Sequence, residues 1–283
     1  MPHRSSPEVA ARIDRWWSIA KNDFLSDPFG PMAKAGLFQI GLPGAGAELD
    51  SYRAIAAAEQ AIAARTGLLG LASAFAARQM AARFFIGGFA NQAQRDIWLP
   101  RIAAGEVCTS IAISEPGAGA HPKLLKTTAE SSGAGFILSG AKAWITNGLD
   151  ADLFLVLAVV AVEDGRKRYG LFLVPKDMAG LSTKPMKALN ALAPATHCEL
   201  AFDGCVLPAS ARIGDMADAY PAMALPFRDV EDTVGTVEVR ATFRQPFDLL
   251  AQTTKIAGRL GVPIGAISSE HPVWLGDQDS NLD

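Results

Sequence analysis

Apolar residues recur every three or four positions through the first part of the chain, which predicts helices over residues 1–107. Ser6 and Pro7 suit an N-cap and a first helical position, and the following residues keep helical spacing: Val9, Ile13, Trp16, Trp17 and Ala20. A second helix is expected after Pro31, and a third from the N-cap Asp50 to Gly67. The alanine-rich stretch 68–85 predicts a buried helix.

The pattern changes near residue 108. From there to residue 207, short apolar runs rich in β-branched and aromatic residues alternate with glycine, asparagine and aspartate, and Asn147-Gly148 signals a turn. This predicts an antiparallel β-barrel or sandwich. The candidate strands are Thr109–Ser114, Gly135–Ser139, Ala143–Thr146, Leu153–Val162, Gly170–Pro175 and Glu199–Phe202.

Helical spacing returns after Pro208, over Val230–Phe243 and Phe247–Leu260 with a break at Pro246. Residues 268–283 show no period and predict an irregular tail. We therefore expect an α+β protein with three domains: an N-terminal helical domain over 1–107, a middle β domain over 108–207 and a C-terminal helical domain over 208–283.

Composition narrows the functional classes. The net charge of -3 gives little support to nucleic-acid binding. The longest apolar run, Leu153–Val162, is too short to span a bilayer, so no membrane span is expected. Three cysteines without a CxxC pair favour a reducing cytoplasm. The four histidines are scattered, and His197 and Cys198 would point apart on a strand, so no metal site is expected.

Five segments, in matching order and spacing, resemble the acyl-CoA dehydrogenase family over about residues 33–208. They are AKAGLFQIGLP (33–43), WLPRIAAGE (98–106), ISEPGAGA (113–120), FILSGAKAWITNG (136–148) and FDGCVLP (202–208). ISEPGAGA is similar to the most specific signature of that family. A nicotinamide site is disfavoured, because Pro122 stands where a GxGxxG motif needs its third glycine.

The resemblance implies that FAD binds in the middle domain. Pro116 would fix one φ, and Gly117 and Gly119 would let backbone N–H groups approach the ligand. Trp144 would offer a flat apolar face, and the Thr146 hydroxyl would lie beside the reactive ring nitrogen. The implied cofactor-binding residues are Ile111, Ile113, Ser114, Gly119, Ala120, Trp144 and Thr146. The sequence departs from the family at Ala120, where a serine is usual, and at His121, where an aspartate is usual.

The family reaction also needs a carboxylate base from the C-terminal helical domain. The resemblance implies that this domain is incomplete here, as in a C-terminally shortened, divergent member. FRDVEDTVG, residues 227–235, resembles the start of one helix that carries the base in relatives. Asp229 and Glu231 are the candidate catalytic residues, although acids at a helix N-terminus are also common for electrostatic reasons.

Together these features predict an FAD-dependent acyl-CoA dehydrogenase-like oxidoreductase of fatty acid or acyl-CoA metabolism. The resemblance implies an acyl-CoA thioester as substrate, an electron-transfer flavoprotein as electron acceptor and assembly into a homo-oligomer or hetero-oligomer. Two alternatives stay open. One is a non-catalytic subunit or pseudoenzyme that lacks the base. The other is a flavin oxidase or monooxygenase of the same superfamily.

Overall fold

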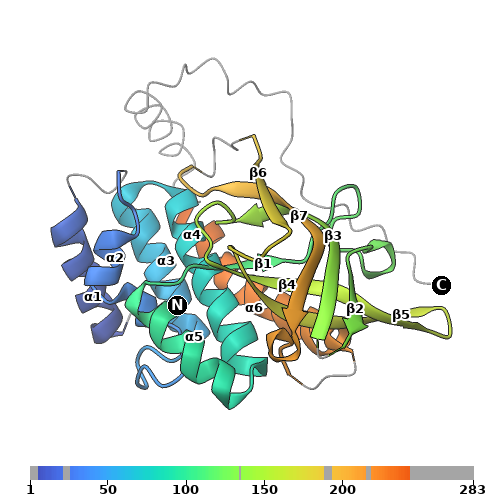
Figure 1. The fold of residues 1–283 in the computed structure, drawn as a ribbon. Coiled ribbons are helices and arrows are strands. Elements are labelled where there is room, and N and C mark those ends of the chain that lie inside the picture. Colours follow the sequence, from blue (N-terminus) through green and yellow to red (C-terminus); the bar gives the residue numbers. More distant parts are fainter. Residues whose placement is uncertain (1–5, 22–25, 134, 188–192, 215–217, 243–283) are drawn as a thin grey trace, which may run out of the picture. The chain divides into compact units, whose positions relative to one another are not determined.

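The computed structural model describes residues 6–21, 26–133, 135–187, 193–214 and 218–242. The chain divides into two compact units, Met1–Ala241 and Thr242–Asp283, and all the packing described below lies within the first. That unit places helices beside a β-sheet (Figure 1), so the expected α+β fold class is confirmed. The expected helix 247–260 and the tail 268–283 lie outside the described residues.

The helices that precede the sheet follow the predicted order. They are α1 (Pro7–Ala20), α2 (Gly30–Lys34), η1 (Leu37–Gln39), α3 (Tyr52–Thr66), α4 (Leu69–Ala81), the π-helical turn η2 (Ala82–Gly87) and α5 (Gln92–Ala104). Ser6 caps α1 as expected, since its hydroxyl accepts from the Val9 N–H at 3.3 Å. The cap of α3 is Ser51, not Asp50, because the Asp50 carboxylate is already bound to Arg83 and to the Gly44 N–H.

The sheet has seven strands, in the order β1-β4-β2-β3-β7-β6, with β5 paired to β4. The sequence predicted an antiparallel arrangement, but the sheet is mixed, because β1 and β2 each pair with β4 in parallel. The strands are β1 (Thr109–Ala112), β2 (Thr128–Ser132), β3 (Gly135–Thr146), β4 (Leu153–Glu163), β5 (Arg166–Pro175), β6 (Leu181–Pro185) and β7 (His197–Pro208). The short helical turn η3 (Pro122–Leu124) lies between β1 and β2, and η5 (Ala209–Ala211) follows β7.

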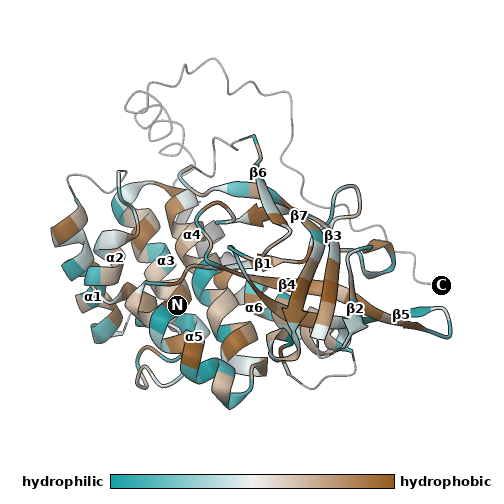
Figure 2. Cartoon of the chain, in the orientation of Figure 1, coloured by the Kyte–Doolittle hydropathy of each residue, from teal (hydrophilic) through white to brown (hydrophobic). Residues whose placement is uncertain are grey.

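Strand β4 is buried on both faces, which explains its continuous apolar run. Leu153, Leu155 and Leu157 pack toward the helices in a core that also contains residues of η2, α5 and α6. Phe154 and Val156 face the opposite way into a second core formed by the strands. Figure 2 shows the result as brown along β4, with hydrophilic colour appearing toward the tip of the β4–β5 hairpin.

Two expected strands, Gly135–Ser139 and Ala143–Thr146, are parts of the single long strand β3. Its pairing with β7 shifts register between Leu138 and Gly140 and again between Lys142 and Ile145. Gly140 adopts a φ of +138°, and a Cβ there would lie 2.7 Å from the Thr127 Cα, so only glycine fits this close approach. These two register shifts interrupt the alternation of buried and exposed side chains that is typical of a strand.

Helix α6 (Ala219–Thr242) follows the sheet and begins eleven residues earlier than the helix expected at Val230. Pro226 lies inside it. Met223, Phe227 and Val230 on this helix belong to the core shared with the other helices and β4. Among the described residues, no helix is both long enough and apolar enough to cross a membrane.

Candidate functional site

One cavity lies where the sheet, α4 and α6 meet. Its volume is about 320 Å³, at the lower end of the range of small-molecule pockets. Residues of β1, the following bend and the end of β3 form one wall, and residues of α4 and α6 complete it. The lining residues are Ala77, Met80, Thr109, Ser110, Ile111, Ile113, Ser114, Ala120, Trp144, Ile145, Thr146, Tyr220, Met223, Ala224, Phe227 and Glu231.

This cavity brings together most of the residues that the sequence singled out for cofactor binding. Six of those seven line it: Ile111, Ile113, Ser114, Ala120, Trp144 and Thr146. Gly119 is not a lining residue but directly precedes Ala120 in the same bend. The glycine-lined bend and the tryptophan-threonine strand therefore border one common space, although 23 or more residues separate them in the sequence.

The bend is a tight reversal closed by its own backbone. The Glu115 N–H donates to the Gly119 carbonyl at 2.8 Å, and the Gly119 N–H donates back to the Glu115 carbonyl at 3.1 Å. Gly117 and Gly119 both have positive φ, +71° and +56°, which glycine adopts without the penalty that a Cβ would bring. The Gly119 N–H thus already has an acceptor inside the bend, so this donor is not the one that would face a ligand.

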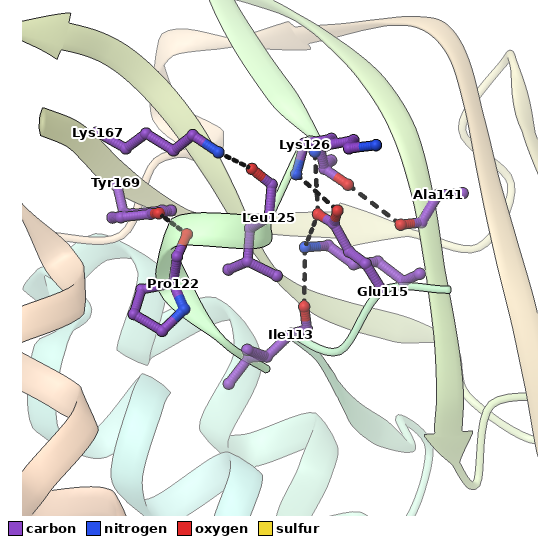
Figure 3. A network of polar contacts seen from close by, with 10 residues as sticks. Ile113, Glu115, Pro122, Leu125, Lys126, Ala141, Lys167 and Tyr169 are labelled. Atoms are coloured by element: carbon purple, nitrogen blue, oxygen red, sulfur yellow. Dashed lines mark hydrogen bonds and ion pairs between the residues drawn. The ribbon is translucent and has the colours of Figure 1, made fainter. Parts of the chain in front are cut away.

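The Glu115 side chain fixes the bend to the rest of the sheet. Its carboxylate accepts from the backbone N–H groups of Lys126 at 2.6 Å and Thr127 at 2.9 Å, and from the Lys142 ammonium group at 2.9 Å. Lys142 also donates to the Ile113 carbonyl at 3.0 Å. Donors from two separate segments of the chain, residues 126–127 and strand β3, thus converge on the carboxylate of Glu115 (Figure 3).

Burial sets the electrostatics of this ion pair, since the side chain of Lys142 is 0% exposed and that of Glu115 is 5% exposed. Burial lowers the pKa of Lys142 to about 8, and the adjacent carboxylate offsets part of that shift. Burial alone would raise the pKa of Glu115, but hydrogen bonds from Thr127 and Lys126 and the charge of Lys142 together hold it below its usual value. Glu115 is therefore ionised at neutral pH.

Strand β5 holds the loop that follows the bend. The Lys167 ammonium group donates to the Leu125 carbonyl at 2.6 Å, and the Tyr169 hydroxyl donates to the Pro122 carbonyl (Figure 3). Lys167 also donates to the Lys123 carbonyl at 2.8 Å. Burial raises the pKa of Tyr169 to about 12, so this phenol stays protonated. The anchors leave the bend little freedom to move independently of the sheet.

Trp144 stands at the second irregularity of β3, with a φ of +62°. A left-handed backbone at a residue other than glycine costs about 1–2 kcal/mol. Its indole is 57% exposed at the cavity, so burial offsets little of that cost. Backbone strain of this kind is concentrated at ligand sites, where a bulge turns a side chain toward the ligand. The strained backbone and the place in the cavity lining together make Trp144 a candidate site residue.

Thr146 ends β3, and its surroundings are polar and well fixed. Its carbonyl accepts from the Ser110 hydroxyl at 2.5 Å, and its own hydroxyl lies 3.3 Å from Nε2 of His197, its neighbour on β7. The next residue, Asn147, has a φ of +60° and donates from its side chain to the Ala74 carbonyl of α4 at 2.8 Å. Thr146 is thereby held between the sheet and the helices.

Helix α6 supplies the opposite wall from one face. Its contributions recur at helical spacing: Tyr220, Met223, Ala224, Phe227 and Glu231. Phe227 packs against Phe84 and Phe85 of η2, with ring centroids 5.0 and 5.1 Å apart. Both candidate catalytic acids are exposed, and of the two only Glu231 lines the cavity.

The lining fits a flat ring system with polar edges. Ile111, Ile113, Met223 and Phe227 give the lining its apolar part, and Ser114 and Thr146 add hydroxyls and Trp144 an indole. This donor set suits the isoalloxazine ring of FAD, which is planar and carries oxygen and nitrogen atoms at its edge. The volume does not hold the whole dinucleotide, so its phosphates and adenosine would have to extend outside the cavity.

Sequence reasoning missed several contributors. The cavity-facing residues of α4 and α6 give no local signal, because Met80, Met223 and Phe227 look like ordinary helix core residues. One signal was available for Lys142, a lysine inside a strand pattern, since a buried lysine requires a partner. Its partner Glu115 lies 27 residues away, and spacing alone does not identify that pair.

Comparisons with known proteins agree with this geometry. Residues 5–106 match the family model for the acyl-CoA dehydrogenase N-terminal domain, and residues 110–205 match the model for the middle domain. The chain is similar to the mitochondrial isovaleryl-CoA dehydrogenase of Pongo abelii, with 37% identity over 126 residues. That alignment includes 44% of this chain and 30% of the relative, so the chain spans less than a third of that relative's length.

Solved structures show the same fold. A glutaryl-CoA dehydrogenase from Mycobacterium smegmatis in complex with FADH2 has a TM-score of 0.70 and 24% identity, over 86% of this chain and 64% of that one. The prolyl acyl carrier protein oxidase AnaB has a TM-score of 0.72 and 25% identity, over 89% of this chain and 69% of that one. At these identities the structural likeness concerns the fold.

Proposed function

This chain belongs to the acyl-CoA dehydrogenase family over its N-terminal and middle domains, and from that premise we propose that it is an FAD-dependent oxidoreductase that introduces an α,β double bond into an acyl-CoA thioester. The observation that carries the proposal is the shared cavity. It combines the bend, the strained Trp144, the Thr146 hydroxyl and one carboxylate, Glu231, around a space suited to a flavin ring.

Bound FAD would supply the redox chemistry, accepting a hydride from the substrate β-carbon. The residues of this chain bind and orient. Ile111 and Ile113 would contact the ring face, while Ser114 and Thr146 would offer hydroxyls to the ring edge. The Trp144 indole would cover the open side and limit the access of water.

Glu231 is the proposed base. Its carboxylate would take the proton from the substrate α-carbon as the hydride leaves the β-carbon, and the electron pair of the broken Cα–H bond would form the double bond between the two carbons. The position of Glu231 on the cavity wall supports this role over Asp229. The apolar neighbours Met223 and Phe227 would help to keep the thioester dry.

The cellular setting follows from the same proposal. The electrons would pass from the flavin to an electron-transfer flavoprotein, as in the family. Three buried thiols without a disulfide suit a reducing compartment, which supports a cytoplasmic location. Assembly with further copies or with a related subunit would complete the cofactor site, because the phosphates and adenosine of FAD would extend beyond a cavity of about 320 Å³.

A flavin oxidase is the second candidate function. Its support is the structural similarity to the prolyl acyl carrier protein oxidase AnaB, at 25% identity over 89% of this chain. An oxidase would use the same cavity but pass electrons to oxygen. Release of hydrogen peroxide in air, dependent on a thioester substrate, separates this candidate from a dehydrogenase.

The direct test is an anaerobic titration of the FAD-loaded protein with a panel of acyl-CoA thioesters, monitored by loss of flavin absorbance. We expect at least one thioester to bleach the flavin. Glu231→Gln should slow bleaching by about 10²–10⁴-fold, the usual contribution of a general base. Asp229→Asn, two residues away on the same helix, is the matched control and should bleach normally.

Two results would count against the proposal. If no thioester bleaches a fully loaded flavin, the chain is a non-catalytic relative. If Asp229→Asn and Glu231→Gln slow the reaction equally, the assignment of the base is wrong.

A further inference from the structure

The second register shift of β3 releases two backbone N–H groups from the sheet. Between Lys142 and Ile145, β3 carries one residue more than β7, as in a β-bulge. The two residues in this gap, Ala143 and Trp144, have no paired residue on β7. The Ala143 N–H donates instead to the Ser114 carbonyl at 2.9 Å. The Trp144 N–H also has its acceptor outside the β3–β7 pairing.

That acceptor is the thioether sulfur of Met186, the residue after β6. The Met186 N–H donates to the His197 carbonyl at 3.0 Å, which continues the pairing of β6 with β7. Because β7 lies between β3 and β6 in the sheet, the Met186 side chain has to reach across β7. Its Sδ atom accepts from the Trp144 N–H at 3.3 Å, in a contact that is exposed to solvent. A loop at one edge of the sheet is thereby connected to the cavity.

Trp144 is the cavity residue that this contact holds. Its φ of +62° is unfavourable for any residue with a Cβ, and its indole is 57% exposed where it lines the cavity. Strained conformations persist only where the surrounding structure holds them. Burial holds this side chain little, so the hydrogen bond to its N–H carries more weight. Without an acceptor on Met186, the bulge would relax more readily and the indole would leave the cavity lining.

The sulfur of a methionine is open to oxidation by peroxides. Its lone pair attacks one peroxide oxygen, the S–O bond forms as the O–O bond breaks, and the departing oxygen takes up a proton and leaves as water or an alcohol. The thioether thus loses two electrons to become a sulfoxide, and the peroxide is reduced. In a sulfoxide the acceptor is the new oxygen, and 3.3 Å between nitrogen and sulfur leaves no room for it between them. The oxidised side chain therefore has to move from its present place.

We propose that Met186 is a site of oxidative modification, whose thioether sulfur positions Trp144 at the cavity and whose sulfoxide releases it. The inference rests on the proposed flavin site and deepens it, because a peroxide would then weaken the hold of this chain on the flavin ring. Met178 provides the matched control. It is half-buried like Met186 but lines a separate groove beside α5 and is not part of the cavity lining.

The test is the affinity for FAD before and after brief exposure to hydrogen peroxide, at a dose that adds one oxygen to Met186 as measured by peptide mass spectrometry. Oxidation should weaken binding about three- to tenfold, the equivalent of one hydrogen bond. Met186→Leu should bind as weakly as the oxidised natural protein and should not respond to peroxide, whereas Met178→Leu should behave as the natural protein does. In a Trp144→Ala background, Met186→Leu should have no further effect, because Met186 acts through Trp144.

The protein without flavin provides a second measurement, the hydrogen exchange of the Trp144 backbone amide, followed by NMR after ¹⁵N-tryptophan labelling and identified by its loss in Trp144→Ala. Exchange should be about three- to tenfold faster in Met186→Leu and after oxidation, the equivalent of the same hydrogen bond, and unchanged in Met178→Leu.

Three results would overturn the proposal: equal amide exchange in the natural and Met186→Leu proteins, no oxygen added to Met186, or a loss of FAD affinity on oxidation that persists in Met186→Leu. If the untreated protein takes up no FAD, the proposed function fails instead, and the amide exchange still decides whether Met186 holds Trp144.

Discussion

The ion pair between Glu115 and Lys142 has a desolvation cost that its hydrogen bonds offset. Removing one partner from such a pair leaves a buried charge unpaired, which costs about 3–5 kcal/mol, whereas replacing both by apolar or neutral groups is often tolerated. The backbone donors at Lys126 and Thr127 need an acceptor in either case. At the scale of single residues, this pair links the bend to β3 and to residues 126–127.

Glu115→Gln should therefore lower the free energy of unfolding by about 3–5 kcal/mol, because Lys142 loses its counter-charge. Glu115→Gln combined with Lys142→Met should recover most of that loss, since the glutamine oxygen still accepts from the backbone. Chemical denaturation at pH 7 measures both values. A double variant no more stable than Glu115→Gln would show that the pair is not the cause.

The pKa of Glu115 also predicts an acid dependence. Because the folded-state pKa lies below the unfolded value of 4.5, the stabilisation is complete above that pH and is lost as the pH falls through the folded-state pKa. The unfolding free energy of the natural protein should fall more steeply below pH 4.5 than that of the Glu115→Gln, Lys142→Met variant. Parallel slopes in urea titrations over pH 3–5 would contradict the shift.

Asn147 combines a left-handed backbone with a hydrogen bond to α4. Asn147→Gly removes the hydrogen bond and also the Cβ that a left-handed backbone disfavours, whereas Asn147→Ala removes the hydrogen bond and keeps a Cβ in that conformation. We expect the alanine variant to be less stable than the glycine variant by about 1–2 kcal/mol, the cost of the left-handed conformation. Equal stabilities in thermal denaturation would mean that the backbone relaxes at this turn.

At the scale of elements, the sequence predicts best those helices and strands whose burial produces a clear apolar pattern. Strand β4 is evident because both of its faces are covered. Strands β2 and β6 were missed because their side chains are mostly exposed and carry little apolar signal. The bend and the end of β3 were identified through family resemblance, but the strained Trp144 and the pair Glu115–Lys142 depend on long-range packing that spacing does not encode.

Helix α6 provides a test of its own packing. Phe227 is buried among aromatic residues, whereas Leu225 on the same helix is 63% exposed. Phe227→Ala should lower the unfolding free energy by about 3–5 kcal/mol, and Leu225→Ala should change it by no more than about 0.5 kcal/mol. Similar losses for both variants would contradict the docking of α6 on η2.

At the scale of the whole molecule, the helices and the sheet share one core, and the cavity lies within that same unit. The reactivity of the cysteines tests whether this unit is folded, because Cys108, Cys198 and Cys205 are all buried. Burial raises the pKa of Cys108 and of Cys198 to about 11 and raises that of Cys205 as well. A disulfide reagent at pH 8 should leave the native protein unmodified and titrate three thiols in denaturant.

The central claim is that the bend and the end of β3 enclose a flavin ring, and FAD uptake by the purified chain of 283 residues tests it most directly. Equilibrium titration should show saturable binding with the absorbance of bound flavin. Trp144→Ala and Thr146→Val should each weaken binding about tenfold or more, the loss of roughly one ring contact or one hydrogen bond. Val206→Ala, on an exposed side chain outside the cavity lining, is the control and should bind as the natural protein does. A colourless protein that takes up no FAD, or equal binding by all three variants, would contradict the account.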